Sequence, residues 1–321
     1  MIPNKKENIS LTDEILAHLY NLRGLNKFAA IKTALKYRRL CKNYYKIILH
    51  ILRKKYPIEA NLRSGDRLIM RNNMEVQLDG GRFDGFEYDT TNDVVTLPRL
   101  SCLDNNPRVK IYGGVNNGDI RDIFVDNVYQ GLPVKGKTVV DVGANIADSS
   151  IYFATHGAYR VIGLEPFPRN YELAQKNIEY NKLSNKITIQ LAGCGANNRE
   201  ISIDPVYERG IYSVLKDFDE GIKVPLLTLD NVLDTHKDVI GNTPVVLKMD
   251  CEGCEYETIL SAAGSTLKRF SHIIIEYHLG YKNLKAKLEK NSFKVSVARP
   301  RIYTLERLKL RLGYIFAEKN W

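Results

Sequence analysis

Residues 138–150 read TVVDVGANIADSS, a candidate apolar strand followed by a turn of small residues and by polar residues suited to begin a helix. Apolar runs of strand length alternate with amphipathic stretches from here to the C-terminus. This alternation predicts an α/β fold with a doubly wound, mostly parallel seven-stranded sheet. We expect strands at 138–143, 160–165, 186–192, 245–250, 272–277, 293–298 and 314–318, helices at 147–156, 169–182, 255–263 and 281–290, and shorter β pieces at 200–204 and 223–227.

The chain before this domain shows two other patterns. Residues 1–60 are predicted to form a basic helical segment, because apolar side chains recur at helical spacing between positions 25 and 55. Residues 61–133 are rich in turn-forming residues and predict a small β-rich accessory region, which leaves 134–321 as the main domain. Within the accessory region we expect a hairpin of 67–71 with 75–78 and a helix at 120–128.

The positive charge of the chain is concentrated near its N-terminus. The formal net charge is +10, and residues 1–65 alone hold 14 Lys and Arg against 4 Asp and Glu, so the remainder carries no surplus. A local basic surplus suggests an anionic contact, and residues 25–55 are candidates for a membrane-surface contact. Packing of this segment with a charged solvent face is the favoured alternative. Nucleic acid is not expected, because nothing beyond charge resembles an RNA-binding module, and a homo-oligomer remains open.

Three features bear on the cellular compartment. No apolar stretch approaches the roughly 20 residues of a membrane span. The first ten residues, MIPNKKENIS, lack the apolar core of a signal peptide. The five cysteines have no framework spacing, which is typical of proteins from a reducing compartment. We therefore predict a cytoplasmic protein.

The turn after the first strand is the first candidate binding element. Gly143 and Ala144 let a ligand approach the backbone closely, and the following helix offers free N–H groups. Only one glycine is present, so the turn does not fit the pyrophosphate fingerprint of dinucleotide-binding domains. A cationic ligand suits Asp141 and Asp148 better than a phosphate would. The candidate binding residues here are Asp141, Gly143, Ala144, Asn145, Asp148 and Ser149.

The second strand ends in the run Gly-Leu-Glu-Pro, which closes at Glu165 and Pro166. A carboxylate at this strand end can accept hydrogen bonds from both hydroxyls of a ribose. An exposed strand-end carboxylate without a ligand is the alternative. The pairing of Glu165 with the turn after Asp141 favours the ribose interpretation, and Glu165 and Pro166 join the candidate ligand site.

Two later strands deliver polar side chains to the same edge of the sheet. Asp250 and Glu252 follow one buried strand, and Glu276 and His278 lie on one face at the end of the next. The unperturbed pKa of histidine lies near neutrality, so His278 is a candidate general base. The three carboxylates could orient His278 or take the proton instead. No metal is expected, although these four side chains could bind a hard divalent cation.

The runs VVDVGANIADSS, GLEPFPRN, LKMDCEGCEYE and IIIEYH, in this order and spacing, resemble the FkbM family of S-adenosylmethionine-dependent methyltransferases. The resemblance extends from about residue 131 to the C-terminus. It implies a Rossmann-like class I methyltransferase fold, S-adenosylmethionine as cofactor, and methyl transfer to a hydroxyl, often of a sugar. The residues it implies are Gly143–Asn145 and Glu165 for the cofactor, and Asp250, Glu252 and His278 for the reaction centre.

Two features of these motifs need comment. Ala147 stands where the family usually has a glycine, a departure that affects close packing against the cofactor. Cys251 and Cys254 form a Cys-Glu-Gly-Cys run that superficially suggests zinc or redox chemistry. A structural zinc site normally needs four ligands, and the sequence offers no second such pair, so we predict neither role.

The predicted activity is that of an O-methyltransferase acting on a sugar hydroxyl of a glycan, glycolipid or related metabolite. A nicotinamide-dependent sugar oxidoreductase would share Glu165, but it needs the glycine-rich pyrophosphate turn that this sequence lacks. A non-catalytic adaptor would keep the fold and bind a membrane or RNA through residues 25–55.

Overall fold

The computed structural model describes residues 37–53, 55–65, 67–71, 85–98, 108–115, 117–203, 221–298, 301–305 and 308–320. The chain forms two compact units. The first comprises Met1–Val76 and Arg299–Leu312, and the second comprises Gln77–Ala298 and Gly313–Trp321.

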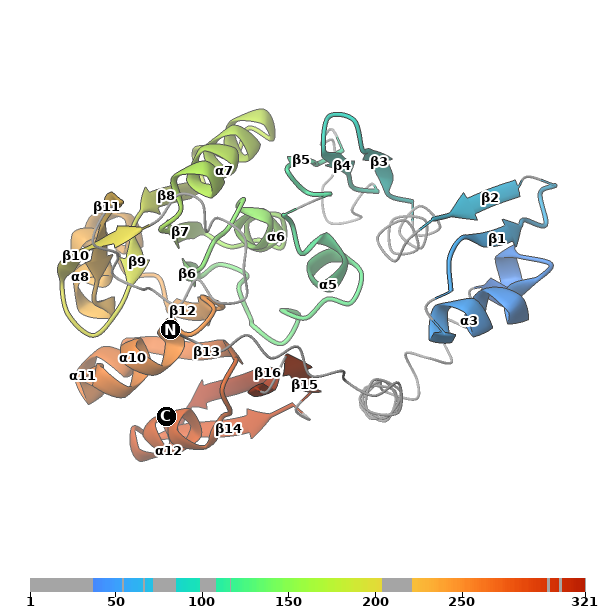
Figure 1. The fold of residues 1–321 in the computed structure, drawn as a ribbon. Helices are drawn as coiled ribbons and strands as arrows, with labels where there is room; N and C mark the ends of the chain where they lie inside the picture. The colour runs from blue at the N-terminus through green and yellow to red at the C-terminus, as the bar shows by residue number, and fades with distance from the viewer. Residues whose placement is uncertain are drawn as a thin grey trace, which may run out of the picture. The chain divides into compact units, whose positions relative to one another are not determined.

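The main sheet has the strand order β14-β16-β13-β12-β6-β7-β8 (Figure 1). From β13 to β8 all neighbours pair in parallel, and β16 is antiparallel to both β13 and β14. This confirms the predicted doubly wound, mostly parallel sheet. The seven strands are β6 (Thr138–Val142), β7 (Arg160–Glu165), β8 (Ile187–Leu191), β12 (Val245–Met249), β13 (Phe270–Tyr277), β14 (Phe293–Val297) and β16 (Leu308–Lys319).

The order of the strands fixes where a ligand can bind. The chain enters the middle of the sheet at β6, runs outward through β7 and β8, and then returns to β12 on the other side of β6. This reversal makes the carboxyl ends of β6 and β12 a topological switch point, where ligands bind in α/β sheets. The short strands β9 (Gly193–Cys194), β10 (Arg199–Ile203) and β11 (Ile222–Leu227) form a separate three-stranded sheet between β8 and β12 in the sequence.

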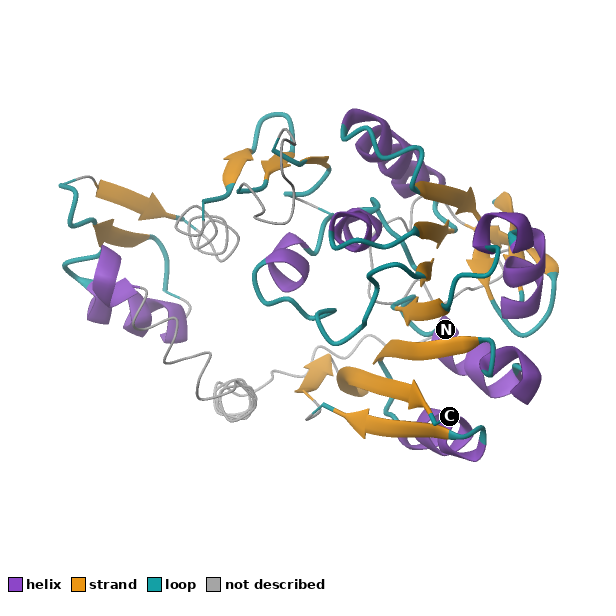
Figure 2. Cartoon of the chain, turned by 180° about the vertical axis from the view of Figure 1, so that it is seen from behind, coloured by secondary structure: helices purple, strands orange, loops and turns teal. Residues whose placement is uncertain are grey.

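Helices cover both faces of the main sheet (Figure 2). Val139 packs in one core with Ile151, whereas its neighbour Val140 packs in the opposite core with Leu233. The central strands therefore read as continuous apolar runs rather than as alternating ones. The helices of the second unit are α5 (Ile120–Phe124), α6 (Asp148–Thr155), α7 (Pro168–Tyr180), α8 (Leu229–Thr235), α9 (Lys237–Ile240), α10 (Cys254–Ser261), α11 (Gly264–Leu267) and α12 (Lys282–Lys290).

A small antiparallel sheet of β3 (Glu87–Asp89), β4 (Val94–Thr96) and β5 (Lys110–Tyr112) is tied to α7 by two asparagines. Asn177 accepts a hydrogen bond from the backbone N–H of Tyr112 at 2.7 Å and donates to its carbonyl at 2.9 Å. Asn181 makes the same pair of bonds with Lys110, at 3.0 and 2.7 Å. The second compact unit therefore includes this small sheet together with the main sheet.

The first unit contains α3 (Tyr44–Arg53) and the antiparallel pair β1 (Ile58–Asn61) and β2 (Arg67–Met70), together with β15 (Arg301–Leu305) paired to the first residues of β16. Strand β2 therefore pairs with β1, and its predicted partner at 75–78 lies outside the described residues, as do positions 25–36 of the basic segment. Among the described residues, no helix combines the length and the apolar character needed to cross a bilayer.

A buried ion pair interrupts the apolar sequence of β12. Lys248 is 1% exposed, and its Nζ lies 2.9 Å from Oδ1 of Asp141, which is 0% exposed. The same ammonium donates a hydrogen bond to the carbonyl of Gly143 at 2.7 Å. Burial alone would lower the pKa of Lys248, but the carboxylates of Asp141 and Asp250 raise it above its ordinary value. Lys248 thus stays charged and joins β12 to the end of β6.

We expect Lys248→Met to lower the free energy of unfolding by about 3–5 kcal/mol, because Asp141 would remain as a buried charge without a partner. Urea denaturation followed by circular dichroism measures this change. The exposed Lys290 at the end of α12 supplies a matched control, and Lys290→Met should cost less than about 0.5 kcal/mol. Equal stability of the two variants would contradict a structural role for the ion pair.

Candidate active site

The turn after β6 crosses the end of β12 at very close range. Gly143 has a φ of 78°, and a methyl group on its Cα would overlap the carbonyl oxygen of Asp250. The backbone N–H groups of Gly143 and Ala144 donate to the carbonyl of Leu164 at 3.0 and 2.9 Å. Glycine is required here for its backbone conformation and for this approach, and the turn is fixed by β7 on one side and β12 on the other.

Three of the predicted binding residues, in or next to this turn, are buried. Asp141 accepts hydrogen bonds from the hydroxyls of Ser149 and Ser150 at 2.7 and 2.6 Å, in addition to its ion pair with Lys248. The side chains of Asp141, Ser149 and Ala144 are all buried. Their contacts in the structure are with the protein, so they shape the turn, and its more accessible residues are Gly143 and Asn145.

Ala147, which stands where the family usually has a glycine, lies at the start of α6. Ala147 is the residue before the helix, and its φ of 66° lies in the left-handed region, which costs a non-glycine residue roughly 1–2 kcal/mol. Its methyl group is fully buried. Asp148 follows and accepts hydrogen bonds from the backbone N–H groups of Asp119 and Ser149 at 2.8 and 2.9 Å. Burial raises the pKa of Asp148 to about 6.

The carboxylate at the end of β7 joins two backbone segments. Glu165 is 3% exposed and accepts hydrogen bonds from the N–H of Asn145 at 2.8 Å and from that of Phe167 at 3.0 Å. Burial raises the pKa of Glu165 to about 7. The amide of Asn145 donates to the carbonyl of Asn117 at 2.7 Å, and Pro166 is half-buried beside Glu165. The structure thus brings the turn and the second acidic position together, as the sequence predicts.

A second acidic group gathers at the ends of β12 and β13. Asp250 accepts a hydrogen bond from the hydroxyl of Tyr129 at 3.1 Å, and Glu276 accepts one from that of Tyr314 at 2.8 Å. Burial, and after it the charge of Asp250, raise the pKa of Glu276 well above its usual range. The carboxyl group of Glu276 therefore gives up its proton less readily than that of an ordinary glutamate, because a further negative charge in this small space is unfavourable.

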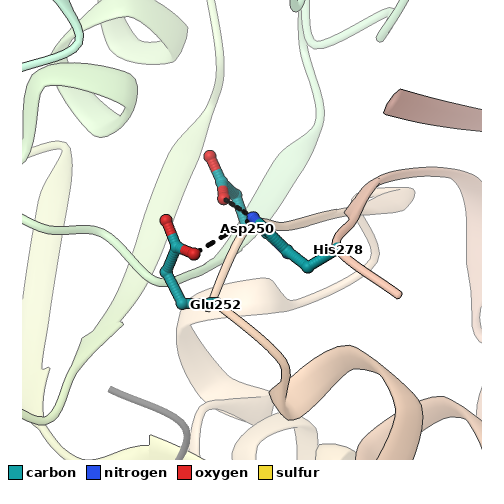
Figure 3. Close-up of side chains that lie close together, drawn as sticks. All are labelled: Asp250, Glu252 and His278. Carbon is teal, nitrogen blue, oxygen red and sulfur yellow. Dashed lines mark ion pairs between the residues drawn. The ribbon is translucent and has the colours of Figure 1, made fainter. Parts of the chain in front are cut away.

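His278 lies between carboxylates, and Figure 3 shows Asp250 and Glu252 directed toward it. Its Nε2 is 3.2 Å from Oε2 of Glu252 and 4.0 Å from Oδ1 of Asp250. On the other side of the ring, Nδ1 is 3.0 Å from Oε1 of Glu255. Burial lowers the pKa of His278, but the hydrogen bond and charge of Glu255, and then Glu252, raise it to about 9. His278 therefore holds its proton at neutral pH, unlike the base of ordinary pKa that the sequence suggested.

The loop that carries Glu252 is closed by a disulfide between Cys251 and Cys254. The two cysteines, for which the sequence predicts no zinc site, thus bind each other. Glu252 has a φ of 55°, and burial raises the pKa of its carboxyl group to about 7. The disulfide holds the short segment between β12 and α10 that positions this side chain.

Sequence reasoning missed three residues that shape the site: Lys248, Glu255 and Tyr129. Lys248 and Glu255 stand inside the quoted run LKMDCEGCEYE, where a lysine within an otherwise apolar strand was a visible signal of a buried partner. Glu255 is 0% exposed in α10 and could be read as an ordinary helix residue. Tyr129 lies just before the region of family resemblance, and no pattern connects it with Asp250.

The close contact between the turn and the end of β12 predicts how a methyl group added at Gly143 changes stability. Gly143→Ala should lower the free energy of unfolding by about 3 kcal/mol or more, because overpacking adds to the cost of a left-handed alanine. Gly136 is a matched control, since its φ of 70° is similar and nothing lies near its Cα. Gly136→Ala should cost only about 1 kcal/mol. Chemical denaturation of both variants tests this, and equal losses would show that the close approach to Asp250 is unimportant.

The fold is similar to that of solved methyltransferases. A precorrin-6y C5,15-methyltransferase from Geobacter metallireducens is 15% identical, with a TM-score of 0.34, over 61% of this chain and 87% of that chain. A putative tRNA (m1A22) methyltransferase of Streptococcus pneumoniae, in complex with S-adenosyl-L-methionine, is 16% identical, with a TM-score of 0.35, over 58% and 69%. These likenesses are too distant to add to what the strand order shows. No curated protein matches the chain.

The sequence of the main domain matches one family profile, that of the methyltransferase FkbM domain, over residues 141–295. This range begins at the aspartate of the first strand and ends within β14, so it contains the turn, Glu165 and the group around His278. Residues 141–295 therefore form a methyltransferase domain of the FkbM family, and its methyl donor is S-adenosylmethionine.

Proposed function

We propose that the protein is an O-methyltransferase that transfers the methyl group of S-adenosylmethionine to a sugar hydroxyl of a glycan, glycolipid or related metabolite. One observation carries this proposal: the turn at Gly143 packs directly on the backbone of Asp250. A cofactor bound at the turn would consequently lie beside the acidic group that surrounds His278. Methyl donor and proton-handling groups would then share the carboxyl edge of β6 and β12.

The placement of the cofactor starts from Gly143, Asn145 and Pro166, which remain partly accessible beside the buried carboxylate of Glu165. We assign Glu165 to the ribose hydroxyls, because a carboxylate oxygen that already accepts a backbone N–H can accept a second hydrogen bond. Gly143 and Asn145 would line the cofactor, with Pro166 beside the adenosine. Asp148, which is largely ionised at neutral pH, would favour the ammonium of the methionine part. Asp141, Ala144 and Ser149 are assigned a supporting role under the turn.

The reaction is a direct displacement at the methyl carbon. The acceptor oxygen forms a bond to that carbon, the bond between the carbon and the sulfonium sulfur breaks, and S-adenosylhomocysteine leaves with the electron pair. The sulfonium is already a good leaving group, so the protein mainly orients the acceptor and receives its proton. We assign the proton to Glu252, whose side chain is 35% exposed, against 16% for Asp250. Glu276 and His278 would hold the acceptor through hydrogen bonds.

The predicted contact of residues 25–55 with a membrane surface remains a proposal for the acceptor side of the reaction. Of the described residues, Arg38, Arg39, Lys42 and Lys46 expose their side chains, which supports an anionic partner such as a lipid-linked glycan. The cytoplasmic location likewise remains a prediction.

Binding of S-adenosylmethionine should depend on Glu165. Glu165→Ala is expected to weaken the affinity about tenfold to hundredfold, because a hydrogen bond to a charged group contributes about 1.5–3 kcal/mol. The wild-type affinity should rise about tenfold between pH 6 and pH 8, since the pKa of Glu165 is about 7 and its ionised form accepts the hydroxyls. Calorimetric titrations at both pH values measure each effect.

Glu165→Gln is the control for the pH effect, because it keeps the shape of the side chain and cannot ionise. It should remove the rise in affinity while retaining part of the binding. A pH dependence that is the same in Glu165→Gln and in the wild type would show that another group titrates. Unchanged affinity in Glu165→Ala would place the ribose elsewhere.

Methyl transfer should depend on Glu252. Incubation of the full chain with deuterium-labelled S-adenosylmethionine and glycan or glycolipid extracts should give O-methylated sugars detectable by mass spectrometry. Glu252→Gln should lower this rate by about 100-fold or more, the range of general-base contributions, while its affinity for S-adenosylmethionine stays within about threefold. Glu257→Gln, an exposed carboxyl group on α10, should leave the rate unchanged. Labelled methyl groups on nitrogen or sulfur alone would contradict the hydroxyl assignment.

A further inference from the structure

We propose that Asp250, Glu252 and His278 form a binding site for a divalent transition-metal cation, which would hold the acceptor hydroxyl. One carboxylate oxygen from each acid and one ring nitrogen of His278 lie within 4.8 Å of one another. The three side chains come from the ends of β12 and β13 and are directed at a common point (Figure 3). The role in holding the acceptor rests on the function proposed above, whereas cation binding can be tested without it.

The environment of His278 is the observation that favours a metal over a simple acidic cluster. Histidine ligands of metals characteristically donate their second ring N–H to a carboxylate or carbonyl, which fixes the tautomer and the ring orientation. Here Nδ1 lies 3.0 Å from the fully buried carboxylate of Glu255. Glu255 is itself held by the backbone N–H groups of His278 and Gly253, at 3.2 and 2.8 Å. Nε2 is thereby aimed at the two remaining carboxylates.

The charges around Nε2 require a positive centre. Without a cation, the proton on Nε2 of the charged ring faces oxygen atoms of Glu252 and Asp250, and a bound cation would take the place of that proton. Asp250 uses its other oxygen, Oδ2, to accept the hydroxyl of Tyr129, so Oδ1 is the one left for the site. Three electron-pair donors that face one another repel unless a proton or a cation lies between them. A divalent cation would satisfy all three at once.

The geometry fits a small cation after minor side-chain movement. Bonds of about 2.0–2.2 Å to nitrogen and oxygen place neighbouring ligand atoms roughly 3.3–3.6 Å apart around a tetrahedral centre. The separations from Nε2 are 3.2 Å to Glu252 and 4.0 Å to Asp250. One imidazole with two carboxylates suits cations such as Mn²⁺ and Zn²⁺. Three protein ligands leave at least one position open for an outside oxygen.

This open position gives the cation a role in the proposed reaction. A hydroxyl oxygen bound to a divalent cation has a lowered pKa, which makes it a better nucleophile at neutral pH. A carboxylate can bind a cation through one oxygen and keep the other free. Glu252 can therefore act as a ligand and still receive the proton of the acceptor. The site would select acceptors that present a hydroxyl to the cation.

The test uses the full chain, freed of metals with a chelator and then titrated with Mn²⁺. Loss of the electron paramagnetic resonance signal of free Mn²⁺ reports binding, and Zn²⁺ is added as a competitor in a second series. We expect saturable binding of at least one of the two cations. His278→Asn and Glu252→Gln should each weaken it at least about tenfold. His272→Asn is the matched control, because His272 lies on the same strand, 3.8 Å from the carboxylate of Glu318, and should have no effect.

Glu255→Gln tests the positioning of the histidine separately from its coordination. This variant keeps all three proposed ligands and should weaken cation binding about 10- to 100-fold. Circular dichroism verifies that each variant is folded. The inference is overturned if neither cation binds, or if binding is the same in His278→Asn and in the wild type. Calorimetry with S-adenosylmethionine on the same samples separates this outcome from failure of the proposed function, since cofactor binding does not require the cation.

Discussion

Inside the main sheet a lysine ammonium and an aspartate carboxylate meet where neither reaches water. Lys248 of β12 and Asp141 of β6 form this pair, and Lys248 also holds the carbonyl of Gly143. Each charge would be very unfavourable in this position without the other, so the two strands are fixed in their relative register. This contact fixes the position of the turn that follows β6. Hydrogen bonds from that turn and from Asp250 then place Asp250 and Glu165.

The site collects more acidic groups than it can leave ionised together. Burial and the charge of Asp250 raise the pKa of Glu276, and a proton on His278 balances part of the negative charge. This cluster of side chains can release or bind a proton or a cation with little rearrangement. Its carboxylates are already held by tyrosine hydroxyls and backbone N–H groups. That property suits both a reaction that liberates a proton and the binding of a cation.

Regions outside the four sequence motifs also contribute to the unit that holds the main sheet. The small sheet of β3 to β5 joins it because Asn177 and Asn181 of α7 pair with the backbone of β5 as another strand would. Tyr129, which precedes the first strand of the main sheet, reaches Asp250. The group around Asp250 is therefore built partly by chain segments that carry no family motif.

The sequence by itself determined the strands of the main sheet and its doubly wound, mostly parallel class, because apolar runs of strand length alternate with amphipathic helices. It also determined which strand ends carry Gly143, Glu165, Asp250 and His278. Only the tertiary structure decided how these groups are charged, because a pKa depends on neighbours that are distant in the chain. Glu255 is 23 residues from His278 in the sequence and raises its pKa. Lys248 forms an ion pair with the carboxylate of Asp141, which lies far from it in the sequence, so no local pattern reveals the contact.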